Sequence, residues 1–472
     1  MSPYKRYEIK TCETKPAALT PNKFKPVVNR VRLARMLLRE AFHYKFDPEL
    51  LLSRPCIYGV FSGPVGGFWP LKQKCVGCMR CVQEYPDMCQ VLIDERYKKL
   101  GDSYFLPDAI TTLNLEATNG KVPVRGVGYK GPFMGPGFDS MWTDMSEIVR
   151  PTRDGIYGRE YISTAVEIGR KAKYLSFENG MPLETGKSFS SSPVLEIPLP
   201  IIFDHLPDTL SHDTVSKSIH LASKRLGTLF VSPTPPQDKE LFPYWVPLVG
   251  VGRFESTVTF PHPVPMMEVQ VFEISSRETA KLLAVGRQFS QTVVAVRLPL
   301  NRKSFDAIME LYKAGLGVFH LVSDYHGMEI GEKEPRFIKD SLLDIHRCLV
   351  QEGIRDEVTL IASGGIIRAE HLPKVIICGA DAVALDTPVP VALHAQFQGE
   401  CASVDAAHLK TFPVNPVWGT QRIVNFCAAW RNQFLEIVSA MGIRDVRRLR
   451  GETGRAMFYE DLEKEAFSWM RE

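Results

Sequence analysis

Four of the ten cysteines lie close together, at Cys75, Cys78, Cys81 and Cys89. The C-x2-C-x2-C spacing of the first three lets three thiolates converge on one metal cluster, while backbone amides of the tight loop donate to the sulfurs. Three thiols at this spacing with no metal would be liable to oxidation. We therefore predict an iron–sulfur site. Zinc and unrelated buried cysteines are the weaker alternatives, since zinc-binding cysteine pairs are normally separated by a longer span.

The sequence leaves the identity of the fourth ligand of this cluster undecided. In ferredoxin-type segments a further cysteine follows the third after three residues and precedes a proline, but here Tyr85 precedes Pro86. A single cluster is therefore expected, either 4Fe-4S or, with three ligands only, 3Fe-4S. The fourth ligand is Cys89, Cys56 or no protein residue, and we favour Cys89 because it is nearest along the chain.

A second group of candidate residues follows two apolar runs near the C-terminal third, Val358–Ile366 and Gly379–Pro388. Such runs, with no polar alternation, are typical of strands covered on both faces. The residues at their ends are Ser363, Gly364, Gly365, Asp386 and Thr387. Glycines let backbone amides approach a ligand closely, and the loops after strands 7 and 8 of a parallel barrel commonly bind phosphate. We predict a phosphate-binding end of a cofactor-binding barrel here.

Six earlier strands are needed to position this end, and six apolar runs supply them. They are Leu199–Asp204, Thr228–Ser232, Val246–Val251, Met267–Phe272, Thr292–Arg297 and Val318–Val322. Helical patterns fill most of the gaps between them. A series of eight such units favours an α/β fold, a (β/α)8 TIM barrel. The rival, an open doubly wound sheet, is disfavoured because no G-x-G-x-x-G follows the first strand.

The remaining segments complete the expected organisation. Residues 1–72 form an N-terminal arm and helix, 73–119 a ferredoxin-like iron–sulfur segment, 120–417 the barrel, and 418–472 C-terminal helices. The pattern over 159–175 predicts one more helix before the first barrel strand.

Composition limits the class of protein. The 472 residues are 44% hydrophobic and 24% charged, with a net charge of +3, so a large core is expected and neither a nucleic-acid nor a membrane partner. The N-terminus lacks the apolar run of a signal peptide. We expect a cytoplasmic protein.

Three stretches of the chain resemble the FMN-binding synthase domain of glutamate synthase, in the short archaeal type with a ferredoxin-like insert. Residues 361–388 resemble the family's strand 7, glycine pair, helix and strand 8, which ends there in Gly-Thr. Residues 408–416 resemble its His-Leu-Asn-Thr-Cys-Pro-Val segment, and residues 424–451 its terminal helix. The likeness covers roughly residues 120–450.

Two departures limit what this resemblance implies. Of the three cysteines that hold a three-iron cluster in the family, only Cys401 lies in the corresponding region, and Phe412 replaces the motif's cysteine. The glycine-rich segment after strand 6, which helps hold the flavin and 2-oxoglutarate, is here SDYHGMEIGEKEP, from Ser323. The barrel's own cluster is therefore expected to be missing, and the substrate is open.

The resemblance gives the strand-end residues roles around FMN. Ser363, Gly364, Gly365 and Thr387 would hold the phosphate, and Asp386 would have to face the ribityl hydroxyls. Arg297 stands where the family has a lysine and would stabilise the reduced flavin, unless it forms a salt bridge at the rim. Gln270 would bond the ring or fill the interior.

His326 and Asp324 follow strand 6, where catalytic residues of such barrels lie. His326 would donate a proton or bind a substrate carboxylate; an ordinary loop histidine is the alternative. Asp204 and His205 at the end of strand 1 have weaker support.

The function implied is a glutamate synthase-like oxidoreductase, in which electrons pass from a low-potential donor through the iron–sulfur cluster to FMN and then to a 2-imino acid-like acceptor. The alternative is a non-catalytic electron-transfer or scaffold subunit that keeps the barrel. A 2-hydroxy-acid oxidase ranks last because it does not need the cysteines. Expected partners are ferredoxin or a reductase subunit and, since the chain starts with no glutaminase domain, an ammonia-supplying subunit, all in a larger complex.

Overall fold

The computed structural model describes residues 7–15, 20–43, 45–46, 56–63, 66–122, 134–143, 162–171, 177–178, 181–182, 193–207, 210, 212–251, 260, 262–272, 274–402, 409–467 and 469. The chain forms two compact units. The N-terminal unit comprises residues 16–112 and 123–133, and the barrel unit comprises residues 1–15, 113–122 and 134–472.

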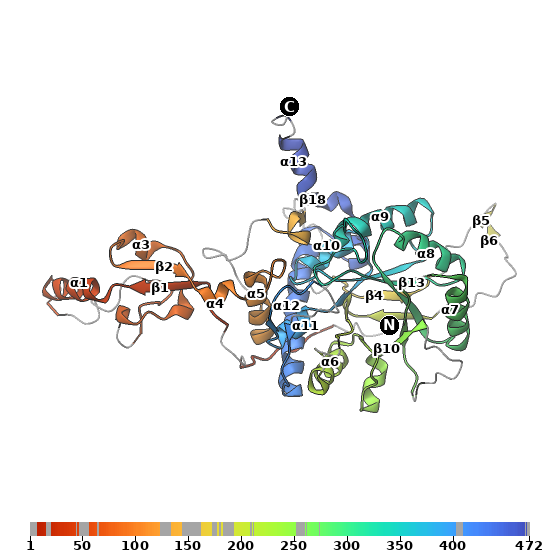
Figure 1. Cartoon of the computed structure of the whole chain (residues 1–472), viewed down its shortest axis with the longest axis horizontal. Coiled ribbons are helices and arrows are strands. Elements are labelled where there is room, and N and C mark those ends of the chain that lie inside the picture. Colours follow the sequence, from red (N-terminus) through yellow and green to blue (C-terminus); the bar gives the residue numbers. More distant parts are fainter. Residues whose placement is uncertain are drawn as a thin grey trace. The chain divides into compact units, whose positions relative to one another are not determined.

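The core of the barrel unit is a closed barrel of parallel strands, in the order β8-β9-β10-β11-β12-β13-β14-β15 (Figure 1). The strands are β8 (Ile201–Phe203), β9 (Phe230–Ser232), β10 (Trp245–Gly250), β11 (Met266–Gln270), β12 (Val293–Pro299), β13 (Val318–Val322), β14 (Thr359–Ser363) and β15 (Ala382–Leu385). All eight strands predicted from the sequence are present, and the predicted TIM barrel is confirmed.

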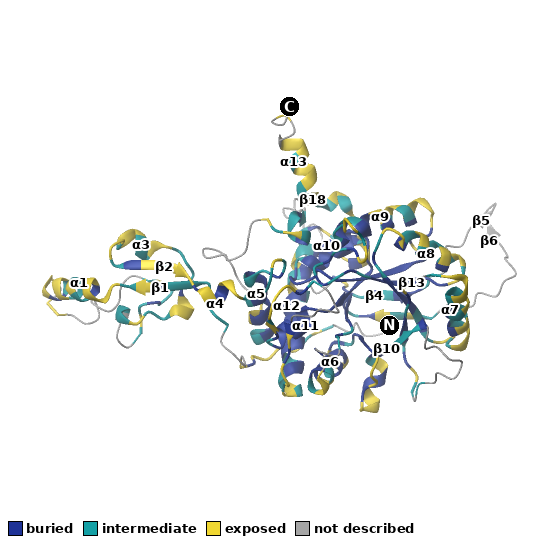
Figure 2. Cartoon of the chain, viewed as in Figure 1, coloured by how far each residue is buried: buried dark blue, intermediate teal, exposed yellow. Residues whose placement is uncertain are grey.

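Helices follow the strands and cover the barrel, because each has one apolar stripe to bury. They include α6 (Asp213–Leu226), α7 (Ser276–Gln288), α8 (Ser304–Lys313), α9 (Ile338–Gln351) and α10 (His371–Ile377). In Figure 2 most residues of the barrel strands are dark blue, whereas α7, α8 and α9 carry exposed residues. Both β14 and β15 are buried along their whole length, which explains their uninterrupted apolar sequence.

The predicted helix over 159–175 is wrong where the chain is described. Residues Val166–Gly169 form a strand, β4, which pairs antiparallel with β7 (Val194–Ile197). Residues 159–161 and 172–175 lie outside the described residues, as does His408 of the family-like segment.

A long C-terminal helix, α12 (Pro416–Ala440), packs on α6, in agreement with the helix expected there. Its Asn425 fastens the start of the chain, since the side-chain amide donates to the carbonyl oxygens of Cys12 at 2.7 Å and Ala117 at 3.0 Å. Beside it, the Thr14 amide donates to the Thr118 carbonyl at 2.8 Å. The first described residues and the end of α5 (Pro107–Asn119) therefore lie side by side on the barrel unit.

The N-terminal unit is built around a two-stranded antiparallel sheet of β1 (Phe24–Val28) and β2 (Cys89–Ile93). Helix α1 (Arg30–His43) follows β1, and the short helix α3 (Arg80–Glu84) precedes β2. The register pairs Val28 with Cys89. Among the described residues of the chain, no helix is both long and apolar enough to cross a membrane.

Candidate functional site

The cysteine loop of the N-terminal unit turns tightly between its cysteines. A short 3-10 helix, Lys72–Lys74, ends at Cys75, and Met79 adopts a left-handed conformation before α3 begins. Gly77 also has positive φ, and a Cβ there would come within 2.5 Å of the Phe24 ring. The chain therefore needs glycine at this turn, which brings Cys75, Cys78 and Cys81 to one face.

These cysteines face a cleft of about 450 Å³. The cysteines that line it are Cys56, Cys75, Cys78 and Cys81. A water molecule occupies about 30 Å³ in the liquid, so the cleft has room for a multi-atom metal cluster. Soft thiolate donors select iron–sulfur clusters, zinc or Cu(I), and this donor set fits the predicted cluster.

Backbone amides donate hydrogen bonds to the sulfurs of Cys75 and Cys81. Burial raises the pKa of the Cys75 thiol, and a hydrogen bond from the Gly77 amide partly offsets this. The amides of Cys81 and Val82 lie against the Cys81 sulfur. Amide donors to cysteine sulfurs help set the potential of iron–sulfur sites.

Cys89, the fourth ligand favoured from the sequence, does not line the cleft with the other three cysteines. It is 3% exposed at the start of β2 and is hydrogen-bonded to the Cys81 side chain. It is absent from the residues that line the cleft. The structure thus brings Cys75, Cys78 and Cys81 together around the cleft, with Cys89 behind Cys81.

In the barrel unit, Arg297 forms a buried ion pair. Its guanidinium donates to Asp204 through two bonds, Nη1 to Oδ1 at 2.6 Å and Nη2 to Oδ2 at 3.0 Å. Burial acts to raise the pKa of Asp204, but the Arg297 charge outweighs it and holds that pKa well below its usual range. The positive charge that the sequence assigned to a flavin is therefore already balanced by Asp204.

The ion pair continues into a polar network inside the barrel. His320 of β13 bonds the Glu268 carboxylate of β11 through Nδ1, and its Nε2 lies 3.1 Å from Ser363 Oγ. Glu268 also lies 3.5 Å from Arg297. Sequence reasoning missed Glu268 and His320. Both could have been found from the sequence, because a charged or imidazole residue inside an otherwise apolar buried strand requires a partner.

Three of these side chains have the composition of a cation site. One ligand atom each of Asp204, Glu268 and His320 lies within 4.8 Å of the others. The Arg297 guanidinium already contacts both carboxylates, so a cation is present there in the form of the protein's own side chain.

The predicted glycine pair serves a close approach between two loops. A Cβ on Gly364 would lie 2.0 Å from Ser323 Oγ and 2.3 Å from the Asp324 carbonyl oxygen. The Gly365 amide donates to the Tyr325 carbonyl at 3.1 Å. The glycines therefore let the loop after β13 pack on the end of β14, and the Gly365 amide is used in that contact.

The end of β15 holds a buried carboxyl with unusual acidity. Burial and the neighbouring Asp204 raise the pKa of Asp386 to about 7, and its carboxylate accepts from the Thr387 amide. The buried hydroxyls Thr387 Oγ1 and Tyr325 Oη have no hydrogen-bond partner within the described structure. Buried polar atoms normally find a partner, so these atoms fit a polar ligand at this end of the barrel.

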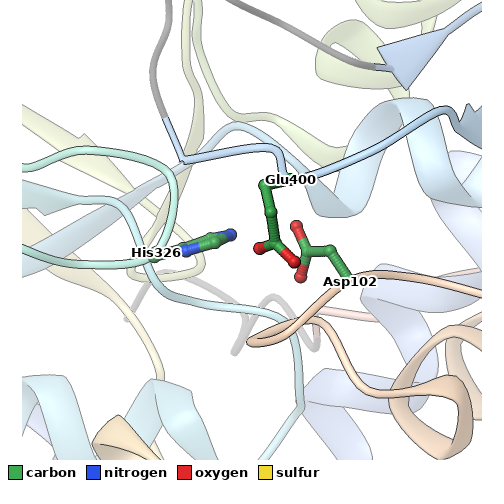
Figure 3. A group of neighbouring side chains, drawn as sticks. All are labelled: Asp102, His326 and Glu400. Atoms are coloured by element: carbon green, nitrogen blue, oxygen red, sulfur yellow. The ribbon is translucent and has the colours of Figure 1, made fainter.

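Asp324 and His326 lie in the loop after β13, as predicted. Asp324 shapes that loop, because its Oδ1 accepts from the Met328 amide at 2.7 Å, and burial raises its pKa. His326 is half-buried, and one of its ring nitrogens lies within 4.8 Å of a Glu400 carboxylate oxygen (Figure 3). Asp102, drawn with them, belongs to the N-terminal unit. Gln270 ends β11 in a half-buried position next to Arg297 of β12.

The comparisons with known proteins point to one family. The model described as the conserved region in glutamate synthase matches residues 337–444. An archaeal glutamate synthase [NADPH] of Archaeoglobus fulgidus is 23% identical, with 91% of this chain and 98% of that protein covered. An archaeal-type glutamate synthase [NADPH] of Dehalococcoides mccartyi is 22% identical, with 80% and 86% covered. The resemblance drawn from the sequence motifs is confirmed.

Among solved structures, a mandelate oxidase covers 66% of this chain and 97% of its own, at 14% identity and a TM-score of 0.38.

Proposed function

We propose that this relative of the archaeal-type glutamate synthases is an FMN-dependent, iron–sulfur oxidoreductase that reduces a 2-imino acid-like acceptor to an amino acid. The observation that carries the proposal is the pairing, in one chain, of a barrel related to those enzymes over nearly its full length with a thiol-lined cleft. A flavin converts between one-electron and two-electron chemistry, which is what a route from an iron–sulfur cluster to an imine requires.

Particular residues would hold the FMN. The unpartnered hydroxyls of Thr387 and Tyr325 would bond its polar groups. Asp386, with a pKa of about 7, is half protonated at neutral pH and so can face a phosphate or ribityl oxygen with less repulsion than an ordinary carboxylate. Gln270 would bond the ring, and Ser363, Gly364 and Gly365 would shape the wall beside it.

Arg297 and His326 would act on the substrate side. The Arg297–Asp204 pair is fixed by two hydrogen bonds, so Arg297 would orient a ligand without supplying a net charge. His326, half-buried beside Glu400, would supply a proton to the amino acid product or bind the carboxylate of the acceptor.

Electrons would enter at the cysteine cleft from a ferredoxin or a reductase subunit. The archaeal relatives are named with NADPH, so we propose NADPH as the ultimate reductant in a larger complex. Ammonia would come from solution or from a glutaminase subunit. Formation of an amino acid from the 2-oxo acid then consumes ammonia, an electron pair and protons, and releases water.

A titration of the apoprotein with FMN tests the proposal. Stoichiometric binding is expected, with quenched flavin fluorescence. Thr387→Val should weaken binding about tenfold, the value of one hydrogen bond to a charged ligand. Thr411→Val is the matched control, because Thr411 Oγ1 donates to the Leu210 carbonyl. It should lower stability and leave FMN affinity unchanged.

The activity is tested under anaerobic conditions with FMN-loaded protein, a low-potential electron donor, 2-oxoglutarate and ammonium or glutamine. Glutamate formation supports the enzyme, and His326→Ala should lower its rate while FMN stays bound. Absence of FMN binding would overturn the proposal.

The second candidate function is a non-catalytic electron-transfer or scaffold subunit. It is favoured because several polar groups that could bind a cofactor are already bonded to other groups of the protein. The Gly365 and Thr387 amides donate to protein acceptors, and Arg297 is paired with Asp204. A protein that carries the iron–sulfur cluster and takes up no FMN would support this function over the enzyme.

A further inference from the structure

The cleft in the N-terminal unit offers four thiols, and one of them comes from outside the C-x2-C-x2-C loop. Cys56 lines the cleft together with Cys75, Cys78 and Cys81. It precedes Cys75 by a stretch with no further cysteine, so spacing alone gives it no priority over Cys89.

We propose that Cys56 is the fourth protein ligand of the iron–sulfur cluster, and that Cys89, which does not line the cleft, does not bind iron. This inference rests on the cluster in the function proposed above. It assigns four thiolates, one for each iron of a 4Fe-4S cluster.

The backbone fixes Cys56 beside the cysteine loop. The Gly59 amide donates to the Cys56 carbonyl at 2.8 Å, which closes a turn, and Gly59 has positive φ. One residue later, the Val60 carbonyl accepts from the Leu71 amide at 2.7 Å. Leu71 in turn accepts from the Lys74 amide at 2.9 Å, so the turn that carries Cys56 is tied to the segment that leads into Cys75.

A second tie holds the same segment from the other side. The Asn22 side-chain amide donates to the Lys72 carbonyl at 2.8 Å and to the Cys75 carbonyl at 2.7 Å. Cys56, Cys78 and Cys81 all lie within electrostatic range of Cys75. Cys56 is therefore a neighbour of the first cysteine of the loop.

Cys89 is unsuited to the fourth position. Its backbone is bound on both sides, since its amide donates to the Tyr85 carbonyl at 2.9 Å and its strand pairs with β1 at Val28. Its side chain is 3% exposed and is absent from the residues that line the cleft, whereas Cys56 is among them.

The test compares Cys56→Ser with Cys89→Ala after anaerobic reconstitution with iron and sulfide. Iron and acid-labile sulfide per chain are measured, and electron paramagnetic resonance is recorded in the oxidised and reduced states. Cys348→Ser is the control, because Cys348 lies on α9 of the barrel unit, and it should match the wild type.

We expect wild type to hold a 4Fe-4S cluster. Cys56→Ser should lose about one iron of four and show the resonance of an oxidised three-iron cluster, or fail to assemble any cluster. Cys89→Ala should keep its full iron content and show the wild-type resonance, because removal of a residue that does not bind iron leaves all four iron sites ligated.

The outcomes separate this inference from the proposed function. If Cys56→Ser keeps four irons and Cys89→Ala loses them, the ligand assignment is overturned while the cluster stands. If both variants keep wild-type iron, neither cysteine is a ligand and the inference also fails. If wild type takes up zinc alone, or no iron with sulfide, the cluster of the proposed function fails and the assignment with it.

Discussion

Inside the barrel, Asp204, Glu268 and Arg297 are buried and bonded to one another, whereas in the N-terminal unit four thiols face a cleft. The barrel's charged groups are satisfied by the chain itself, and apolar strands surround them. The thiols of the cleft have amide support on one side, and we propose that they bind a metal cluster on the other. We infer that the barrel depends on its own side chains for stability, and that the N-terminal unit depends on what it binds.

Removal of the cluster should have the largest effect, and it should be confined to the N-terminal unit. Helix α1 leaves Leu38 61% and Phe42 74% exposed, so this unit has little apolar burial to replace metal ligation. Chelation should lower its unfolding free energy by on the order of 5 kcal/mol or more. Hydrogen exchange should show faster amides in β1 and β2, with those of β14 unchanged. Equal amide protection in β1 and β2 before and after chelation would contradict the inference that the N-terminal unit depends on a bound cluster.

Loss of the buried charge partner should cost nearly as much in the barrel. Arg297→Met leaves Asp204 buried and unpaired, and we expect a loss of about 3–5 kcal/mol in chemical denaturation. Arg447→Met is the control, because its ion pairs with Asp445 and Glu167 are partly exposed and their loss should cost under about 1 kcal/mol. Similar losses in the two variants would mean that the Arg297 pair contributes no more than a surface pair.

The raised pKa of Asp386 predicts a substitution that stabilises the protein, in contrast to Arg297→Met, and only at higher pH. Its pKa rises from 3.8 to about 7 on folding, so its contribution to stability is fully present below pH about 4 and is lost as the pH rises through about 7. Asp386→Asn should therefore match wild type near pH 4 and exceed it above pH about 7, by on the order of 2–4 kcal/mol.

Asp381→Asn is the control for this titration. Asp381 is equally buried, but Arg355 and Arg450 overcome the effect of burial and lower its pKa to about 2. Removal of its charge should destabilise the protein at neutral pH. Denaturant unfolding at several pH values measures both variants, and a flat difference between Asp386→Asn and wild type would contradict the prediction.

Substitution of Gly364 should have the smallest of these effects on stability. It tests whether the glycine pair serves the neighbouring loop or the ligand. Gly364→Ala would place a Cβ against Ser323 and should cost about 2–3 kcal/mol. Gly353→Ala, which also has positive φ but meets nothing within 4 Å, should cost about 1 kcal/mol. If the two variants are equally stable and only Gly364→Ala loses FMN, the glycine serves the ligand rather than the loop.

The sequence predicted the barrel strands well because they are covered on both faces. Residues 359–363 and 382–385 read as apolar runs for that reason. The helix expected over 159–175 failed because β4 is only four residues long, too short for a period of two to be told from one of 3.6.

The candidate site was only partly predictable. The loop of Cys75, Cys78 and Cys81 carries its geometry in its spacing. The contact between Glu268 and His320 joins residues 52 positions apart, and it exists only once the barrel closes. The role of Gly364 was also hidden, because a glycine that admits a ligand and one that admits a neighbouring loop have the same sequence.

The bond between Thr14 and Thr118 has a consequence for the history of the chain. The polypeptide leaves the barrel unit after Lys15 and re-enters it at Leu113, at two points that Asn425 clamps together. An insertion between adjacent points leaves the host's core intact. Most of the cysteine-bearing module, residues 16–112, can thus have been inserted between these points, while residues 123–133 form a second segment of it. A short linker in place of residues 16–112 should leave a barrel that still folds.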